Sequence, residues 1–373
     1  MSHFKDRIDL FKNKSFRNYV ISCTMAMFGN GLTYIAMTWL LVRNNNQVAA
    51  VAILMTCFWL PTIVLGPMMG VVVDKFDRKK ILQFCNLSRA IILSCFWLLF
   101  QGDPPDLAIY MLSLLTGCVL ALYIPAAMTL VREVVDKKDL LYANATVDMA
   151  YEIGAVTGMG ASGLIMALTS VHTTFLINAI CYFFATITLC FVQSQQRKPE
   201  HMSVWSDFVL GMRYLLNHPR LQVIYVIQMF FFVSYMTAPI LLAPYARSVL
   251  HANAGEFGYI EASMSIGAVI GGIISPFLSE KIGFIKILVL ETILCALSFW
   301  AFGHNLYLPY AILWYFFIGF CFSAWPLLIT AAQDQTEMAY QGRVQSVFNS
   351  LSGLLILLFY LLLTLVGDVF NIG

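Results

Sequence analysis

The stretch GVVVDKFDRKK, residues 70–80, lies between two long apolar segments and decides how this chain is organised. It combines a glycine, two acids and four bases in one short interval. Glycine allows two helices to approach closely, an acid stabilises the start of a helix, and bases hold a loop on the cytoplasmic side of a membrane. The stretch therefore predicts a tight cytoplasmic turn between two membrane-spanning helices.

The composition of the whole chain agrees with a membrane protein. Of its 373 residues 60% are hydrophobic and 11% are charged, and the mean hydropathy is +0.78. Soluble domains carry about 25% charged residues, so a lipid bilayer is the expected solvent for this surface. The formal net charge is only +2 and the bases lie in short loops, which predicts no nucleic-acid partner.

Eleven apolar segments are long enough to cross a hydrocarbon core of about 30 Å, which predicts an all-α membrane protein. They fall at 18–42, 48–73, 80–100, 106–131, 140–168, 172–193, 221–247, 256–279, 285–303, 307–332 and 343–366. Of the 22 lysines and arginines, 19 lie in the N-terminal tail, in the loops on its side of the membrane or at the segment ends that adjoin them. This asymmetry predicts a cytoplasmic N-terminus, and the odd number of spans then predicts an external C-terminus.

A polar interval divides the chain into a six-helix bundle at 1–194, a linker at 195–219 and a five-helix bundle at 220–373. In the linker, apolar residues such as Phe208, Met212 and Leu215 recur at helical spacing, which predicts an amphipathic helix at the cytoplasmic interface.

The second half of the chain contains a weaker copy of the stretch at residues 70–80. PFLSEKIGFIK, residues 276–286, aligns with residues 70–80 and places Glu280 on Asp74 and Lys281 on Lys75. Both copies follow the second span of their half, as an internal duplication predicts. A duplicated fold has twelve spans, so the twelfth is expected to be missing from this chain.

The sequence carries no pattern typical of an enzyme or of a bound cofactor. It lacks a GxxxxGK[ST] motif, and its six histidines are scattered without an ExxH pair, which argues against ATP hydrolysis and against a metal centre. All nine cysteines lie in apolar segments. We therefore predict no enzyme activity, no cofactor and no metal.

Charges inside the apolar segments are functional candidates, because each costs about 2.5–3.5 kcal/mol at a helix centre. Asp148 and Glu152 lie one helical turn apart on one face of segment 140–168. Two neighbouring carboxylates repel each other when both are ionised, which favours reversible protonation of one of them. The pair is predicted either to couple proton movement or bind a cation, or to lie near the rim beside Arg132 or Lys138.

Isolated charges lie in other segments at Arg89, Glu261 and Glu291, and Glu261 is expected near the outer end of its segment. Arg89, about two turns into segment 80–100, is expected to brace the inner side of the bundle through Asp74 or Glu133. Glu291 is expected to pair locally with Lys286.

Several stretches resemble those of the major facilitator superfamily. They are residues 70–80, FGNGL at 28–32, Leu60-Pro61, Arg89, LLYAN at 140–144, WSDFVLGMRY at 205–214 and GRV at 342–344. The chain is similar in particular to the branch that includes enterobactin export and related efflux proteins. It departs from the superfamily at Asp77, where glycine is usual, and at GAVTGM, residues 154–159, where antiporters show GPxxGG.

The resemblance implies a fold of two pseudo-symmetric six-helix bundles, here with about 11 helices, that rock about a central site. It implies a gate at the inner end, formed by Gly70, Asp74, Lys75, Arg78, Arg89, Glu280 and Lys281. The first helix of each half lines the central cavity in this superfamily. Substrate contacts are therefore expected at Asn30, Thr33, Tyr34, Gln228 and Tyr235, and an aromatic stripe at Phe316, Phe320 and Trp325. The alternative for all of these is helix packing or contact with lipid.

These expectations together describe a monomeric secondary transporter of the bacterial inner membrane. It would export a drug-like molecule or a siderophore by alternating access, with Asp148 and Glu152 coupling export to proton antiport. Two alternatives remain at this stage: an importer of a nutrient or metal chelate, and a membrane receptor or scaffold that transports nothing.

Overall fold

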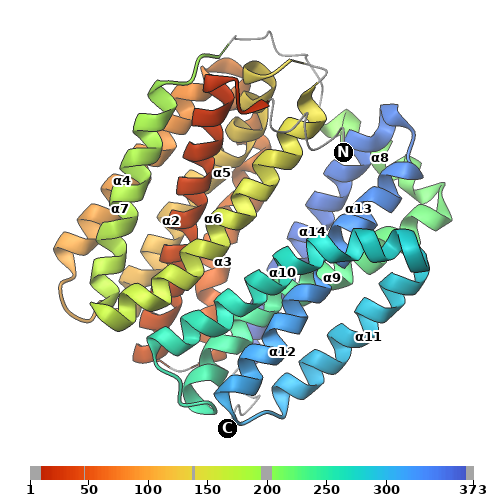
Figure 1. Ribbon diagram of the computed structural model, residues 1–373. Coiled ribbons are helices and arrows are strands. Elements are labelled where there is room, and N and C mark those ends of the chain that lie inside the picture. Colours follow the sequence, from red (N-terminus) through yellow and green to blue (C-terminus); the bar gives the residue numbers. More distant parts are fainter. Residues whose placement is uncertain (1–9, 46, 137–138, 195–203, 367–373) are drawn as a thin grey trace. The chain divides into compact units, whose positions relative to one another are not determined.

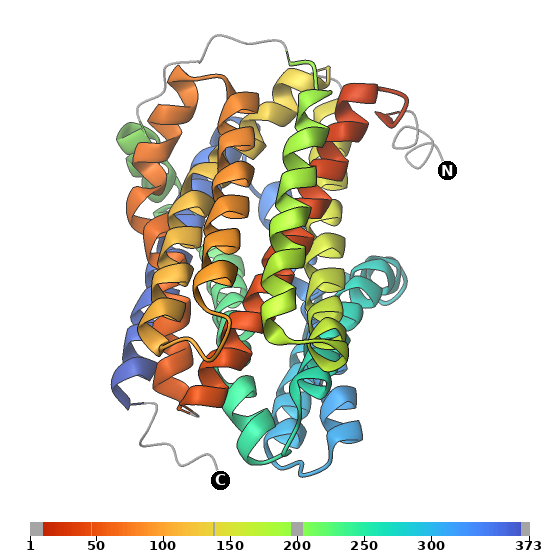
Figure 2. The same ribbon diagram turned by 90° about the vertical axis from the view of Figure 1, so that its left-hand side faces the viewer.

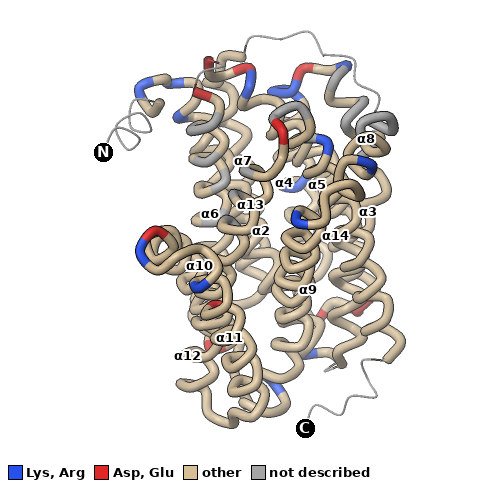
Figure 3. Tube along the Cα trace, turned by 90° about the vertical axis from the view of Figure 1, so that its right-hand side faces the viewer, with Lys and Arg blue, Asp and Glu red and all other residues tan. Residues whose placement is uncertain are grey.

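A computed structural model describes residues 10–45, 47–136, 139–194 and 204–366 (Figure 1). The described residues form α-helices joined by short loops and contain no strand. Charged residues lie mainly towards the helix ends and leave long uncharged stretches of helix between them (Figure 3). Ten of the helices are long and apolar enough to cross a membrane, which confirms the predicted class.

The helices divide into two compact units. Unit 1 consists chiefly of α2 (Lys14–Asn44), α3 (Val48–Lys75), α4 (Arg78–Leu99), α5 (Asp106–Val134), α6 (Leu140–Leu168) and α7 (Val171–Cys190). Unit 2 consists chiefly of α8 (Val204–Leu216), α9 (Pro219–Ser248), α10 (Ala254–Ile282), α11 (Phe284–Gly303), α12 (Leu308–Cys321), α13 (Ala324–Asp334) and α14 (Met338–Val366). In unit 1, α4 and α7 lie side by side along their length (Figure 2).

The stretch at residues 70–80 forms the predicted tight turn between two helices. Helix α3 ends at Lys75 and α4 begins at Arg78, so only two residues separate them. The carboxylate of Asp77 caps α4, because it accepts hydrogen bonds from the backbone N–H groups of Lys79 at 2.9 Å and Lys80 at 3.3 Å. Such a cap contributes about 0.5–2 kcal/mol to helix stability. The acid at position 77 therefore starts the helix where a glycine is usual.

The predicted continuous span at 307–332 is wrong, because the structure divides it into α12 and α13. At the break, three-residue turns replace the α-helical pattern: the N–H of Ser323 donates to the carbonyl of Phe320, and that of Trp325 to the carbonyl of Phe322. Pro326 has no N–H to donate to the Phe322 carbonyl, so the regular ladder cannot pass this point. The membrane-crossing path of this segment is therefore a broken helix.

In both units, glycines allow two helices to pack with their backbones in contact. A Cβ atom on Gly117 of α5 would overlap the carbonyl oxygen of Phe58 on α3. In unit 2, a Cβ atom on Gly319 of α12 would overlap the carbonyl oxygen of Met264 on α10. In each unit the second span therefore packs backbone against backbone on the fourth, as a duplicated fold requires.

Helix α8 lies in the interval where the sequence predicts an amphipathic linker helix. Its Leu215 joins a buried apolar cluster with Leu221 and Tyr225 of α9 and Val344 and Phe348 of α14. Phe208 and Met212 pack against the same cluster. The apolar face of α8 is therefore covered by unit 2.

Candidate functional site

The predicted inner gate contains a buried ion pair in unit 1. Arg78 Nη1 lies 3.2 Å from Glu133 Oε1 of α5, and the two side chains are 6% and 2% exposed. Lys75 is exposed at the end of α3. The side chains of Gly70 and Asp74 lie outside the described residues.

The expected contact between Arg89 and Glu133 is wrong, because Arg78 takes that place. Arg89 lies eleven residues further along α4, which is about 16 Å at the rise of an α-helix. Its proposed partner Asp74 has a side chain outside the described residues.

Arg89 is instead enclosed by aromatic rings. It is 1% exposed, and its guanidinium carbon lies 5.2 Å from the ring centre of Tyr123 and 5.3 Å from that of Tyr182. Nη1 donates to the Tyr182 hydroxyl at 3.4 Å, while Nε and Nη2 are buried without a hydrogen-bond acceptor. Among the described residues no carboxylate pairs with Arg89, so the rings are its main electrostatic support.

The polar residues predicted on the first helix join this cluster. The Tyr182 hydroxyl donates to Asn30 Oδ1 at 2.7 Å, which links α7 to α2. The Asn178 amide donates to the carbonyl of Gly29 at 2.7 Å and also to the Thr33 hydroxyl. Tyr34 is half-buried on α2. In this structure Asn30 and Thr33 therefore form hydrogen bonds between helices within unit 1.

The predicted carboxylate pair lies on α6, but its side chains lie outside the described residues. The backbone of α6 places Asp148 and Glu152 one turn apart, as the sequence predicts. The nearby Gly154 and Gly158 pack against the backbone of α2, at Thr24 and Phe28. The glycines therefore allow close packing of the two helices and fix the face of α6 that meets α2.

In unit 2, the second copy of the loop motif is exposed at the end of α10. Glu280 and Lys281 both lie on the surface. The Lys281 ammonium sits over the ring of Phe277, 4.3 Å from its centre.

The predicted substrate contacts of unit 2 meet at the break between α12 and α13. The ring of Tyr235 on α9 stacks on Phe322, with centres 3.9 Å apart, and Phe322 in turn stacks on Trp325 at 5.9 Å. Phe232, one turn from Tyr235, stacks on Trp325 at 4.9 Å. We call these four residues the aromatic stack. Sequence reasoning named Tyr235 and Trp325 but missed Phe322, whose position depends on the helix break.

The remaining predicted contacts lie outside this stack. Gln228 is fully buried on α9, and neither atom of its amide group has a hydrogen-bond partner among the described residues. Phe316 contacts the edge of Phe317 on the same helix. Phe320 is half-buried, and its backbone faces the glycines of α10.

The expected local pair between Glu291 and Lys286 is also wrong. Lys286 is exposed, whereas Glu291 is 2% exposed and accepts hydrogen bonds from the hydroxyls of Ser275 on α10 and Ser323 at the helix break. Positions five apart do not share a face of a helix, which explains the failure.

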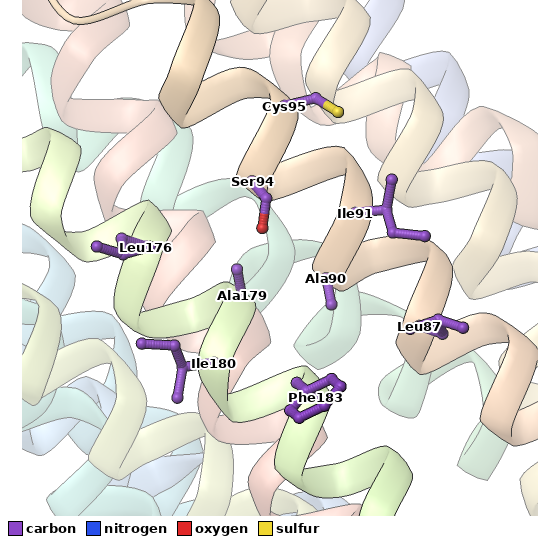
Figure 4. A pocket seen from close by; sticks show the side chains of 9 residues that line it. All are labelled: Leu87, Ala90, Ile91, Ser94, Cys95, Leu176, Ala179, Ile180 and Phe183. Atoms are coloured by element: carbon purple, nitrogen blue, oxygen red, sulfur yellow. The ribbon is translucent and has the colours of Figure 1, made fainter.

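An apolar groove of about 430 Å³ lies between α4 and α7 (Figure 4). Leu87, Ile91, Ile180 and Phe183 line it, and all four side chains are exposed. Exposed apolar side chains on membrane-spanning helices face lipid, so the groove belongs to the lipid-facing surface of unit 1.

The Major Facilitator Superfamily model matches residues 19–360, and the chain belongs to this superfamily. Its members are multi-pass membrane transporters of small molecules and not enzymes, as the sequence predicts.

Several characterised relatives match most of the chain. It is 23% identical to the staphyloferrin A transporter of Staphylococcus aureus, over 95% of this chain and 90% of that protein. It is 22% identical to the multidrug efflux pump Tap of Mycolicibacterium fortuitum, over 87% and 82%. It is 24% identical to the enterobactin exporter EntS of Shigella flexneri, over 75% and 67%.

Two further comparisons concern the length of the relatives that the chain matches and the similarity of its fold to a solved structure. The matches to the Bacillus subtilis transporters YfiS and YkuC span about half of those proteins, 52% of each. The fold resembles the crystal structure of the nucleoside transporter NupG, with a TM-score of 0.73, 13% identity, and coverage of 95% of this chain and 91% of that chain.

Proposed function

We propose that this protein is a secondary active transporter that exports a small amphipathic organic molecule, a drug-like compound or a siderophore, in exchange for protons. Relatives named for enterobactin export, staphyloferrin A transport and multidrug efflux support this substrate class. The proposal places the protein in the inner membrane as a monomer with a cytoplasmic N-terminus.

The observation that carries the substrate class is the aromatic stack, which joins α9 to the break between α12 and α13 in unit 2. Tyr235, Phe322 and Trp325 are only partly buried. Aromatic faces bind flat or apolar ligands through stacking, which contributes about 0.5–1.5 kcal/mol for each pair of rings. The same rings tolerate ligands of different shape, as a pump for amphipathic molecules requires.

In this proposal the carboxylates of α6 couple export to protons. Asp148 and Glu152 lie one turn apart, so ionising both is unfavourable and one of them exchanges a proton during the cycle. The gate residues Lys75, Arg78 and Asp74 hold the inner end of unit 1, and Glu280 and Lys281 hold that of unit 2.

Proteoliposomes with a pH-sensitive dye test the proposed function. Ethidium and enterobactin serve as probes, and an imposed pH gradient drives their movement. We expect the probe and protons to move in opposite directions, and we expect the double variant Asp148→Asn, Glu152→Gln to lose this coupling. Glu337→Gln, which changes an exposed carboxylate, is the matched control. Unchanged coupling in the double variant would refute the assignment of the carboxylates, and probe movement along with the protons would refute export.

A further inference from the structure

The break between α12 and α13 lies beside a buried carboxylate. Ser323 is at the break, and its hydroxyl lies 2.9 Å from Glu291 Oε1 on α11. Ser275 of α10 hydrogen-bonds to the same carboxylate oxygen, and the two serine hydroxyls lie 2.7 Å apart. All three side chains are at most 2% exposed. We call this group the Glu291 cluster.

Small residues on one face of α10 allow the members of the Glu291 cluster to come together. Gly267, Gly271 and Ser275 recur every four residues on one face of α10. A Cβ atom on Gly267 would overlap the Phe316 carbonyl, and one on Gly271 would overlap the Phe320 carbonyl. The glycines therefore bring α12 against α10 up to its last turn, and Ser275 follows one turn later at the break.

The carboxylate in this cluster is incompletely satisfied. Both serines approach Oε1, whereas Oε2 is buried with no hydrogen-bond partner. Among the described residues no lysine or arginine pairs with Glu291, and the titratable groups beside it are the thiols of Cys321 and Cys295. An unpaired carboxylate in an apolar interior is costly as an anion, so a positive charge bound at Oε2 would stabilise the closed cluster.

We propose that the Glu291 cluster is a binding site for one monovalent cation, a proton or Na⁺, at the broken helix of unit 2. Its ligands are all oxygen atoms: the free Oε2 of Glu291, the two serine hydroxyls and the carbonyl of Phe320, which already lies 2.6 Å from the Ser323 hydroxyl. The C-terminal end of α12 adds the negative end of a helix dipole. Oxygen ligands at the C-terminal end of a discontinuous helix are the usual setting for a coupling cation in transporters.

The position of the site connects the cation to the proposed substrate contacts. Ser323 stands between Phe322 and Trp325 in sequence, and both of these residues belong to the aromatic stack. A cation that fixes the break therefore fixes the rings that contact the substrate. This role in coupling rests on the proposed function, whereas binding of the cation to the cluster does not.

Thermal unfolding of the purified full chain in detergent tests the site without any substrate. Wild type and Glu291→Gln are unfolded over a range of pH, each with Na⁺ or with the same concentration of choline. The amide has the shape of the protonated carboxyl, so this variant retains the packing of the closed cluster. Glu337→Gln is the matched control, and Ser323→Ala tests the hydroxyl ligand.

We expect the Tm of wild type and of Glu337→Gln to rise by several degrees as the cation is supplied, and that of Glu291→Gln to rise less. A rise with acid but not with Na⁺ identifies the proton, and a rise with Na⁺ over choline at alkaline pH identifies sodium. The proposal is overturned if Glu291→Gln responds to acid and Na⁺ as wild type does, or if wild type responds to neither. These results are independent of export, so failure of the site and failure of the proposed function remain distinguishable.

Discussion

Among the described residues, each unit contains a buried charged side chain that pairs with no opposite charge, and these two side chains have different chemistry. In unit 1, Arg89 is surrounded by the rings of Tyr123 and Tyr182. In unit 2, Glu291 is held by the hydroxyls of Ser275 and Ser323. A guanidinium keeps its charge under all conditions in proteins, whereas a carboxylate loses its charge by taking up a proton. The charge of Arg89 in unit 1 is therefore fixed, whereas that of Glu291 in unit 2 can change.

The two charges occupy equivalent helices of the duplicated fold. Extending the alignment of residues 70–80 with 276–286 by the same offset of 206 residues places Arg78, the start of α4, on Phe284, the start of α11. It also places Arg89 on Cys295, one turn beyond Glu291. Both units therefore have a buried charged residue on this helix, with opposite sign and at positions one turn apart.

The largest effect is expected from the paired arginine of unit 1. Arg78→Met leaves Glu133 buried without this cation and should lower the free energy of unfolding by about 3–5 kcal/mol. The double variant Arg78→Met, Glu133→Gln should recover part of the loss, because it removes both charges. Thermal unfolding in detergent measures both, with the exposed Arg213→Met of α8 as control. Equal losses in the single and double variants would contradict this account of the pair.

A smaller loss is expected where glycines bring the second and fourth spans together. Gly319→Ala in unit 2 and Gly117→Ala in unit 1 place a methyl group against a carbonyl oxygen, which should cost about 1–3 kcal/mol. Gly272→Ala is the control, because a Cβ atom there meets no neighbour within 4 Å. If Gly117→Ala lowered the free energy of unfolding and Gly319→Ala did not, the second and fourth spans would not be packed alike in the two units.

Removing one hydroxyl beside each buried charge sharpens the comparison between them. Tyr182→Phe removes the hydroxyl that bridges Arg89 and Asn30, and should cost about 1 kcal/mol. Because the arginine charge is fixed, this loss should not vary with pH or Na⁺. The loss caused by Ser323→Ala should vary with both. Chemical denaturation at several pH values measures the two losses, and the same dependence in both variants would contradict the distinction.

In the aromatic stack, where each lost ring pair removes about 0.5–1.5 kcal/mol, the change that matters is expected in affinity for the substrate. Trp325→Ala should weaken the apparent affinity for an exported probe such as ethidium, measured as a higher KM. Phe183→Ala, in the lipid-facing groove of unit 1, should leave the KM unchanged. A KM raised equally by both variants would assign the effect to general packing.

Local chemistry explains which features the sequence alone predicts. The turn at residues 70–80 and the linker helix depend on neighbouring residues, and both are where the sequence places them. The superfamily is predictable for the same reason, because its loop motif, linker and internal repeat are visible in the sequence.

The break in the span at 307–332 and the partners of the buried charges are not predictable in this way. The apolar run continues through Ser323, and only Pro326 gives a local signal for the break. Glu291 meets Ser275 and Ser323, which lie 16 and 32 residues away. Such contacts depend on helix packing at the glycines of α10, so no spacing rule finds them. Arg89 likewise depends on rings from two other helices.

Infrared difference spectroscopy of the protein in lipid, recorded from acid to alkaline buffer without sodium, tests the central claim most directly. The C=O stretch of a protonated carboxyl reports whether a buried acid exchanges its proton. We predict a band that loses intensity with rising pH, by the same amount in wild type and in Arg89→Met and by a smaller amount in Glu291→Gln, which lacks the contribution of this carboxyl. A pH-dependent loss of band intensity as large in Glu291→Gln as in wild type would contradict the claim that Glu291 exchanges a proton.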